Sequence, residues 1–317
     1  MRRKAIVVGS AGQDGKLLCK LLESHDYQVI GLTRSETQTN LNEFAKLHVD
    51  ITNSQEIHKL VEQFLPEEIY FLAAYHHSSE SLIPDTEQLF SESFKINTLS
   101  LVRLLEAISR ITPNTRLFYA ASSLIFGASD ASIQDENTSI NPDTVYGITK
   151  AAGLFACRYY RHNHGVFASV GILYNHESSF RDTRFVSKKI AEGAARIRKG
   201  LGSKLVLGDL DAVADWGYAP DYVDAMHRIL ATEKPDDFVI ATGESHTVRD
   251  FVQIAFDYVG LNYTTCVVTD PALIQRRSPR LIGNPAKLKK VAGWKPSVNF
   301  VTMVRKLVQA ELDKING

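Results

Sequence analysis

Short apolar runs alternate with amphipathic segments over the first half of the chain. The strand-like runs lie at residues 5–8, 27–32, 47–50, 68–72, 116–120 and 167–172. Apolar residues at helical spacing fall between them, at 16–23, 54–64, about 86–109 and about 145–163. Strands that alternate with helices are typical of βαβ units with right-handed crossovers. The pattern predicts an α/β fold built on a doubly wound parallel sheet.

The alternation becomes irregular after residue 173. Glycine and proline recur at positions 200, 202, 208, 217 and 220, and helical patterns return at 223–232, 248–259 and 301–312. We therefore expect two domains, at residues 1–173 and 174–317. The second is the smaller, covers the sheet, and sends some segments back to the first.

A glycine-rich turn follows the first predicted strand. Gly9, Gly12 and Gly15 are spaced GxxGxxG, with Gln13 and Asp14 before the third glycine. Glycines allow a tight turn and let backbone N–H groups approach a pyrophosphate at the start of the next helix. Between a strand and a helix this spacing predicts a dinucleotide site. The alternative is a glycine-rich turn that binds nothing.

The end of the second strand bears on which dinucleotide binds. An acid there would bond the ribose 2′-hydroxyl of NAD, but this chain has Arg34, which can pair with a 2′-phosphate. NADP(H) is favoured and NAD(H) is the alternative. Asp50 follows the third strand, where it would accept from the adenine amino group or cap the following helix.

Tyr146 and Lys150 are spaced i, i+4 at the start of a predicted helix and so share one face. A nearby ammonium lowers the pKa of a phenol, and Tyr146 could then move a proton during hydride transfer. Ser122 and Ser123 follow the fifth strand, at the sheet edge where ligands bind. Either serine can instead cap a turn, which suits Ser123 better than Ser122.

Charge and cysteine content narrow the class of protein. The chain has 36 basic and 36 acidic side chains, which argues against a nucleic-acid partner. Cys19, Cys157 and Cys266 lie far apart, as in a reducing, cytoplasmic compartment. Since no apolar run reaches the ~20 residues of a membrane span, we expect no membrane partner. No ligand spacing resembles a metal site.

These motifs together resemble the extended short-chain dehydrogenase/reductases that act on nucleotide sugars, and within them the GDP-mannose 4,6-dehydratases. The similarity spans nearly the whole chain, including GQDG at 12–15, YFLAA at 70–74, GILYNHES at 171–178, FVSKKI at 185–190 and DWG at 215–217. The resemblance implies a Rossmann domain that binds NADP, a nucleotide-sugar substrate such as a GDP-hexose, and a homodimer or homotetramer.

The resemblance also assigns site residues. It implies hydride transfer by Tyr146 and Lys150, with Ser122 beside them. Implied cofactor contacts, beyond those named above, are Ile51, Leu72, Ala73, Ala74, Tyr75, Leu173, His176 and Arg181. In tetrameric relatives the segment that contains His176 and Arg181 approaches the cofactor of a neighbouring subunit. Implied substrate contacts are Ser122, Asn175, Val186, Lys189 and Leu207, and Arg280 is a further candidate.

Three departures from the family pattern bear on the reaction. The family's catalytic Glu, which removes the C5 proton during dehydration, is Leu124 here. The family's Lys-Arg pair before DWG, whose Arg contacts the diphosphate, is Val213-Ala214. One of two paired arginines is Phe180, and Arg181 remains. Arg276, Arg277 and Arg280 could replace the lost phosphate contact, or form a solvated basic loop.

The departures favour C4 chemistry without dehydration, which means oxidation, ketone reduction or epimerisation. One alternative is a dehydratase proper that uses another base, for which His76 and His77 are the nearby candidates. Another is a non-catalytic regulator that binds cofactor on the same fold. Retention of Tyr146 and Lys150 favours the enzyme.

Overall fold

The computed structural model describes residues 2–33, 45–75, 85–274 and 280–316. Within these residues one parallel sheet of seven strands has the order β11-β6-β5-β4-β1-β2-β3. The strands are β1 (Lys4–Val8), β2 (Gln28–Thr33), β3 (Ala45–His48), β4 (Glu68–Phe71), β5 (Arg116–Ser122), β6 (Phe167–Leu173) and β11 (Asp237–Ile240). The order of the strands reverses between β1 and β4, the position at which such sheets bind ligands. This confirms the predicted fold class.

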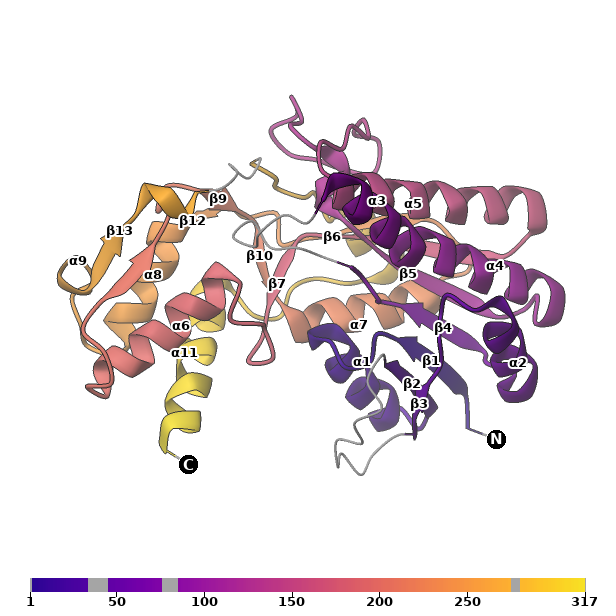
Figure 1. Cartoon of the computed structure of the whole chain (residues 1–317), viewed down its shortest axis with the longest axis horizontal. Coiled ribbons are helices and arrows are strands. Elements are labelled where there is room, and N and C mark those ends of the chain that lie inside the picture. Colours follow the sequence, from indigo (N-terminus) through magenta and orange to yellow (C-terminus); the bar gives the residue numbers. More distant parts are fainter. Residues whose placement is uncertain (1, 34–44, 76–84, 275–279, 317) are drawn as a thin grey trace.

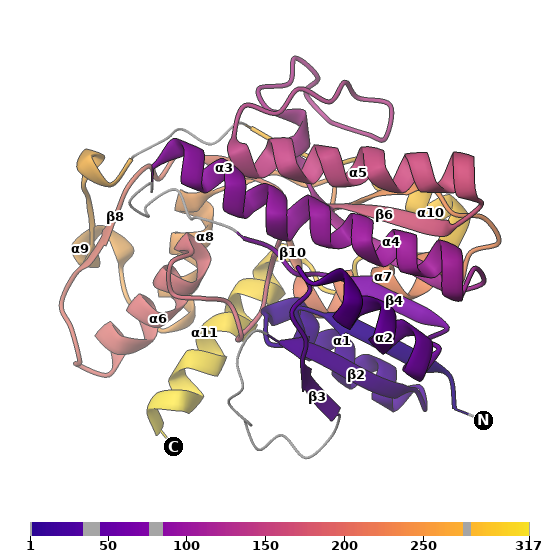
Figure 2. The same ribbon diagram turned by 45° about the vertical axis from the view of Figure 1, so that its right-hand side comes forward.

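Helices cover both faces of the sheet (Figures 1 and 2). One face packs on α2 (Ser54–Phe64), α4 (Ser100–Ile111) and α5 (Val145–His164), and the other on α1 (Gln13–Ser24), α7 (Ala219–Leu230) and α10 (Ala286–Ala292). Along β1, Ile6 and Val8 enter the first core while Ala5 and Val7 enter the second. Alternate strand residues point to opposite faces, so a strand buried on both faces is apolar throughout.

A third core lies beyond the sheet, at the left of Figure 1. Its helices are α6 (Val186–Arg198), α8 (Val248–Tyr258) and α11 (Phe300–Asn316), with the short α9 (Tyr263–Cys266) at its rim. Short strands complete this part: β7 (Asn175–Glu177), β8 (Leu205–Leu207), β9 (Val213–Ala214), β10 (Trp216–Tyr218), β12 (His246–Thr247) and β13 (Val267–Thr269). After residue 173 the chain nevertheless returns to the large sheet through α7, β11 and α10.

The long helix expected at about 86–109 is interrupted. It consists of α3 (Thr86–Phe94), a π-helical turn η1 (Lys95–Leu99) and α4. Single π turns of this kind are frequent at functional sites. The turn places the buried Asn97 against the segment that follows β4, as described below.

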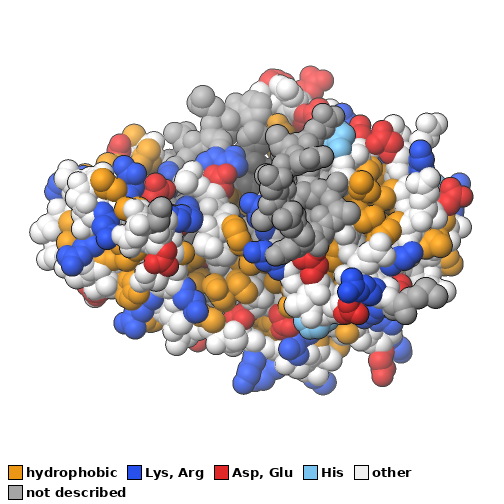
Figure 3. All heavy atoms as spheres, turned by 90° about the horizontal axis from the view of Figure 1, so that it is seen from below, with side chains coloured by type: hydrophobic (Ala, Val, Ile, Leu, Met, Phe, Trp, Pro, Cys, Tyr) orange, Lys and Arg blue, Asp and Glu red, His pale blue; other side chains and the backbone are white. Residues whose placement is uncertain are grey.

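The surface agrees with the balanced charge of the sequence. On the face drawn in Figure 3, basic and acidic side chains are interspersed and form no single basic stripe.

All three cysteines are buried and none is in a disulfide. In the part of the chain that the structure describes, no helix has the length and apolar character of a membrane span, and no group of residues could hold a metal ion.

Candidate active site

The glycine-rich turn joins β1 to α1. Gly9 has φ +94°, and a Cβ there would lie 2.8 Å from the Ala73 amide nitrogen. A Cβ on Gly15 would lie 2.3 Å from the Gly9 carbonyl oxygen. The fold itself therefore requires glycine at both positions.

Gly12 is different, because the chain alone does not demand glycine there. Its φ is −71°, and an added Cβ would meet only the Gly9 oxygen, at 3.4 Å. It is also the N-cap of α1 and makes no side-chain capping bond. Uncapped first-turn N–H groups attract anions, and a missing Cβ lets a pyrophosphate approach them. The turn thus fits the phosphates of a dinucleotide.

The segment after β4 forms the neighbouring wall of the site. The Leu72 amide donates to the Val8 carbonyl at 2.9 Å, which continues the sheet past β4. The Tyr75 amide donates to Asn97 Oδ1 at 2.7 Å, and Asn97 Nδ2 donates to Thr149 Oγ1 at 3.0 Å. Asn97 therefore ties residues 72–75 to α5. Sequence reasoning missed Asn97, although a polar residue inside an apolar helical pattern was a signal.

Tyr146 and Lys150 lie on the first turns of α5, as predicted. The helix begins where Thr144 Oγ1 accepts from the Gly147 amide at 3.1 Å. Lys150 is 1% exposed, its Nζ donates to the Ala120 carbonyl at 2.7 Å, and Nζ lies 5.6 Å from the centroid of the Tyr146 ring. The pair is therefore set against the carboxyl end of β5.

The protonation of this pair differs from the expectation. Burial lowers the pKa of Lys150 to about 7, opposed by the Asp14 charge. Burial raises the pKa of Tyr146 above its usual value, opposed by the Arg181 guanidinium. The prediction that Lys150 lowers the pKa of Tyr146 is therefore wrong for the chain by itself, because desolvation dominates both groups.

Ser122 ends β5, and Leu124 lies in the turn that follows it, next to Gly147 at the start of α5. Ser122 Oγ accepts from the Leu124 amide at 3.2 Å and caps a 3₁₀ turn, η2 (Ser123–Phe126), while Ser123 is buried. The expectation that Ser123 would be the capping serine is wrong, although the Ser122 hydroxyl still has a proton to donate. The Leu124 side chain packs against the first core of the sheet.

Gln13, Asp14 and His176 are brought together, but they bond to the chain itself. His176 Nε2 lies 2.9 Å from Asp14 Oδ2, and Gln13 Nε2 donates to the His176 carbonyl at 3.0 Å. Ser178 Oγ donates to Gln13 Oε1 at 2.9 Å, and the His176 ring stacks on Tyr222 at 4.5 Å. These contacts lock β7 and its following loop onto the glycine-rich turn.

The loop after β7 carries Phe180 and Arg181. Arg181 Nε lies 3.1 Å from Glu177 Oε2, and its guanidinium carbon lies 3.6 Å from the centroid of the Phe185 ring. Phe180 is half-exposed beneath the ammonium groups of Lys16 and Lys20 on α1, at 5.3 and 5.8 Å from its ring centroid. The aromatic side chain thus replaces a cation at a position already flanked by two lysines.

The other predicted cofactor residues differ in burial and in their distance from the glycine-rich turn. Asp50 is exposed, and its Oδ1 accepts from the Thr52 amide at 2.8 Å, whereas Asn53 caps α2. Ile51 and Leu173 are largely buried in the sheet cores. Ala73 and Ala74 follow β4 beside the glycine-rich turn. Arg34, His76, His77, Arg276 and Arg277 lie outside the described residues.

The predicted substrate residues other than Ser122 lie outside the seven-stranded sheet. Asn175 is exposed at the start of β7, Val186 and Lys189 lie on the first turn of α6, and Arg280 is exposed. Leu207 ends β8 with its side chain 2% exposed in the third core. Val213 and Ala214 form β9, and Asp215 is buried after them, where it accepts from Thr242 and from the Gly243 amide.

Comparisons with known proteins agree with this arrangement. The chain is 36% identical over 333 residues to GDP-mannose 4,6 dehydratase 2 of Arabidopsis thaliana, covering 98% of this chain and 87% of that protein. It is 30% identical over 356 residues to GDP-mannose 4,6-dehydratase of Vibrio cholerae, covering 98% and 94%.

Solved structures share the fold at lower identity. UDP-glucose 4-epimerase of Thermotoga maritima with UDP-glucose matches with a TM-score of 0.85 at 19% identity, over 98% of this chain and 99% of that one. RMD of Pseudomonas aeruginosa complexed with NADPH matches with a TM-score of 0.81 at 22% identity, over 99% and 100%. The family profile described as GDP-mannose 4,6 dehydratase matches residues 6–307, so the chain belongs to the GDP-mannose 4,6-dehydratase family.

Proposed function

We propose that the protein is an NADP(H)-dependent enzyme that transfers hydride at C4 of a nucleotide sugar, a GDP-hexose by family membership. Support comes from the Tyr146–Lys150 pair, which faces the end of β5 beside a glycine-rich turn suited to a dinucleotide pyrophosphate. The curated relatives are named GDP-mannose 4,6-dehydratases, and one structural neighbour is complexed with NADPH.

The residues divide the proton chemistry among them. Tyr146 as a phenolate takes the proton of the C4 hydroxyl during oxidation, and as a phenol it returns the proton during reduction. Burial disfavours the phenolate, and the Arg181 guanidinium and a nicotinamide cation, when bound, would favour it. Ser122 orients the same oxygen through its hydroxyl. Lys150 donates from Nζ to the Ala120 carbonyl and so fixes the start of α5 against the end of β5. NADP, when bound, supplies the acceptor or donor of the hydride.

NADP is favoured over NAD by the end of β2. The strand ends at Thr33, and in the sequence Arg34 follows directly, where sites for NAD usually have an acid. The test is a titration of the purified protein with NADPH and with NADH by dihydronicotinamide fluorescence. Tighter binding of NADPH supports the assignment, and tighter binding of NADH replaces it with the alternative.

The reaction proceeds without dehydration, and Leu124 carries this part of the proposal. Elimination of water across C5 and C6 needs a base for the C5 proton, and the Leu124 side chain is a hydrocarbon packed on the core. Oxidation, ketone reduction and C4 epimerisation need only the Tyr146 proton and the hydride. A dehydratase with another base is the second candidate, and product analysis distinguishes the two.

A cofactor-binding regulator would need neither Tyr146 nor Lys150. The discriminating observation is absorbance of the nicotinamide after GDP-sugars are added to the protein with NADP⁺ or NADPH. A change in absorbance with any of them supports the enzyme. A bound cofactor that stays unchanged with every sugar nucleotide, in both redox states, supports the regulator.

A homodimer fits the exposed face of α5. Phe155 is 51% exposed and Tyr159 is 56% exposed, one helical turn apart, and Leu99 in η1 is also exposed. Neighbouring exposed aromatic residues are typical of subunit interfaces. Light scattering on the chain and on its Phe155→Glu variant tests this: a dimer that dissociates supports the interface, and a monomeric wild type removes it.

A further inference from the structure

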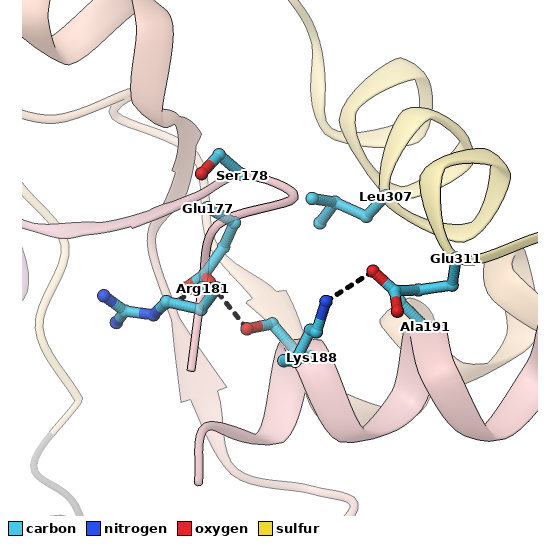
Figure 4. A pocket seen from close by; sticks show the side chains of 8 residues that line it. Glu177, Ser178, Arg181, Lys188, Ala191, Leu307 and Glu311 are labelled. Atoms are coloured by element: carbon cyan, nitrogen blue, oxygen red, sulfur yellow. Dashed lines mark hydrogen bonds and ion pairs between the residues drawn. The ribbon is translucent and has the colours of Figure 1, made fainter. Parts of the chain in front are cut away.

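The C-terminal helix α11 meets α6 and the loop after β7 around a small pocket (Figure 4). Lys188 of α6 and Glu311 of α11 point toward each other across it and form an ion pair, each side chain 8% exposed. Lys314 Nζ lies 2.8 Å from the same Glu311 carboxylate. One buried carboxylate therefore holds two ammonium groups.

Both lysines also bond to a single backbone atom. Lys188 Nζ donates to the Ser179 carbonyl at 3.4 Å, and Lys314 Nζ donates to it at 3.2 Å. A buried ion pair adds little stability over apolar residues of similar volume, because both charges lose their hydration. The cluster of Lys188, Glu311 and Lys314 is therefore better explained by the geometry it imposes on Ser179.

The opposite side of this loop is attached to the glycine-rich turn. Ser178, next to Ser179, donates through Oγ to Gln13 Oε1 at 2.9 Å, and the Phe180 amide donates to Ser178 Oγ at 3.2 Å. Two residues after Ser179, Arg181 pairs with Glu177. The loop is thus held between the C-terminal helix and the first turn of α1.

We propose that Glu311, acting through Lys188 and Lys314, is a positioning residue that holds loop 178–181 against the glycine-rich turn and so sets the affinity of the cofactor site. Glu311 and Lys314 lie outside the motifs named above, and Glu311 is about three hundred residues from Gln13 in sequence. The inference rests on the proposed function only in taking the turn to bind a dinucleotide.

The test compares Glu311→Gln with Asp313→Asn in the full chain. Asp313 lies on the same helix but bonds to Gln309, away from the loop. Hydrogen exchange is measured on segments 9–15 and 178–185 without cofactor, and NADPH affinity is measured by fluorescence. Lys314→Met is the second variant, because Lys314 is half-exposed and its loss removes one bond to Ser179 with little risk of unfolding.

We expect Glu311→Gln to speed exchange in both segments and to raise the dissociation constant for NADPH about tenfold, a typical size for coupling through packed residues. Lys314→Met should change both quantities in the same direction by less, and Asp313→Asn should change neither. If Glu311→Gln and Lys314→Met both keep the wild-type rate of hydrogen exchange in segment 9–15, the positioning role is refuted. A wild-type protein that binds no nicotinamide cofactor would refute the proposed function, while the exchange data would still decide the role of Glu311.

Discussion

His176 Nε2 lies 2.9 Å from the Asp14 carboxylate, so that a residue of β7 is joined to the first turn of α1 across 162 positions of sequence. Burial would lower the pKa of His176, but the charge of Asp14 and the hydrogen bonds to Asp14 and the Tyr174 carbonyl together outweigh it, and the pKa is raised. Burial would raise the pKa of Asp14, and the His176 and Arg181 charges lower it instead.

This ion pair predicts a pH dependence of stability. A histidine with a raised pKa stabilises the fold below its unfolded value of about 6.5, and this contribution is lost as pH rises through the folded pKa. An aspartate with a lowered pKa contributes above about 3.9 and loses its contribution as pH falls. The full contribution is therefore present between about pH 4 and 6.5.

Asp14→Asn should reduce the free energy of unfolding by about 1.5–3 kcal/mol at pH 6, the range for a hydrogen bond to a charged group. The reduction should become smaller as the pH is raised toward 9, because the imidazole loses its proton as the pH passes the folded pKa of His176. Urea denaturation of both proteins at the two pH values measures the difference. An equal reduction at both values would contradict the charged pair.

Lys150 predicts a dependence of the opposite sign. Since burial lowers its pKa to about 7, the unfolded chain binds a proton that the folded chain does not between that value and the ordinary lysine pKa of about 10.4. The advantage of the wild type over Lys150→Met should grow with pH from 7 to 9, by at most about 1.4 kcal/mol per pH unit. A constant difference in urea denaturation over this range would show that Lys150 keeps its charge.

The glycine-rich turn offers a matched pair of substitutions. Gly15→Ala places a methyl group 2.3 Å from the Gly9 carbonyl and should destabilise the fold by about 1–3 kcal/mol. Gly12→Ala fits the chain and should leave the melting temperature nearly unchanged while weakening NADPH binding. Calorimetry and fluorescence titration measure the two effects, and NADPH binding that survives Gly12→Ala would remove the pyrophosphate from that turn.

Tyr146→Phe tests the proton-transfer role. The variant keeps the ring but loses the hydroxyl, so NADPH affinity should stay within about twofold while kcat falls at least ~100-fold, the lower range for general acid–base catalysis. Stopped-flow measurement of nicotinamide absorbance separates hydride transfer from binding. A rate close to wild type would remove Tyr146 from the chemistry.

Local patterns predicted those parts of the structure whose causes are local. Helix 54–64 was predicted with its observed ends, because its apolar spacing is regular and Asn53 caps it. The GxxGxxG turn and the Tyr146–Lys150 pair were found because spacing alone places them. The pairing of β11 with β6 was not predicted, since it joins segments about 65 residues apart and no periodicity encodes it.

The rest of the site depends on contacts that sequence spacing does not contain. Helix α6 was missed, although its small residues Ala191 and Ala194 are buried in the third core. Asn97 and Glu311 act on the site through partners 52 and 123 positions away, Thr149 and Lys188. The chemistry of the motif residues could be predicted, but not what holds them in place.

The most direct measurement of the central claim is product analysis of the purified protein incubated with GDP-mannose and NADP⁺, by mass spectrometry. The Leu124 substitution predicts products that keep every oxygen of the sugar: a 4-keto sugar, or a C4 epimer resolved by chromatography. Leu124→Glu, which restores the family's carboxylate, serves as the comparison. Loss of one water from the sugar at a steady rate in the wild-type protein would contradict the account.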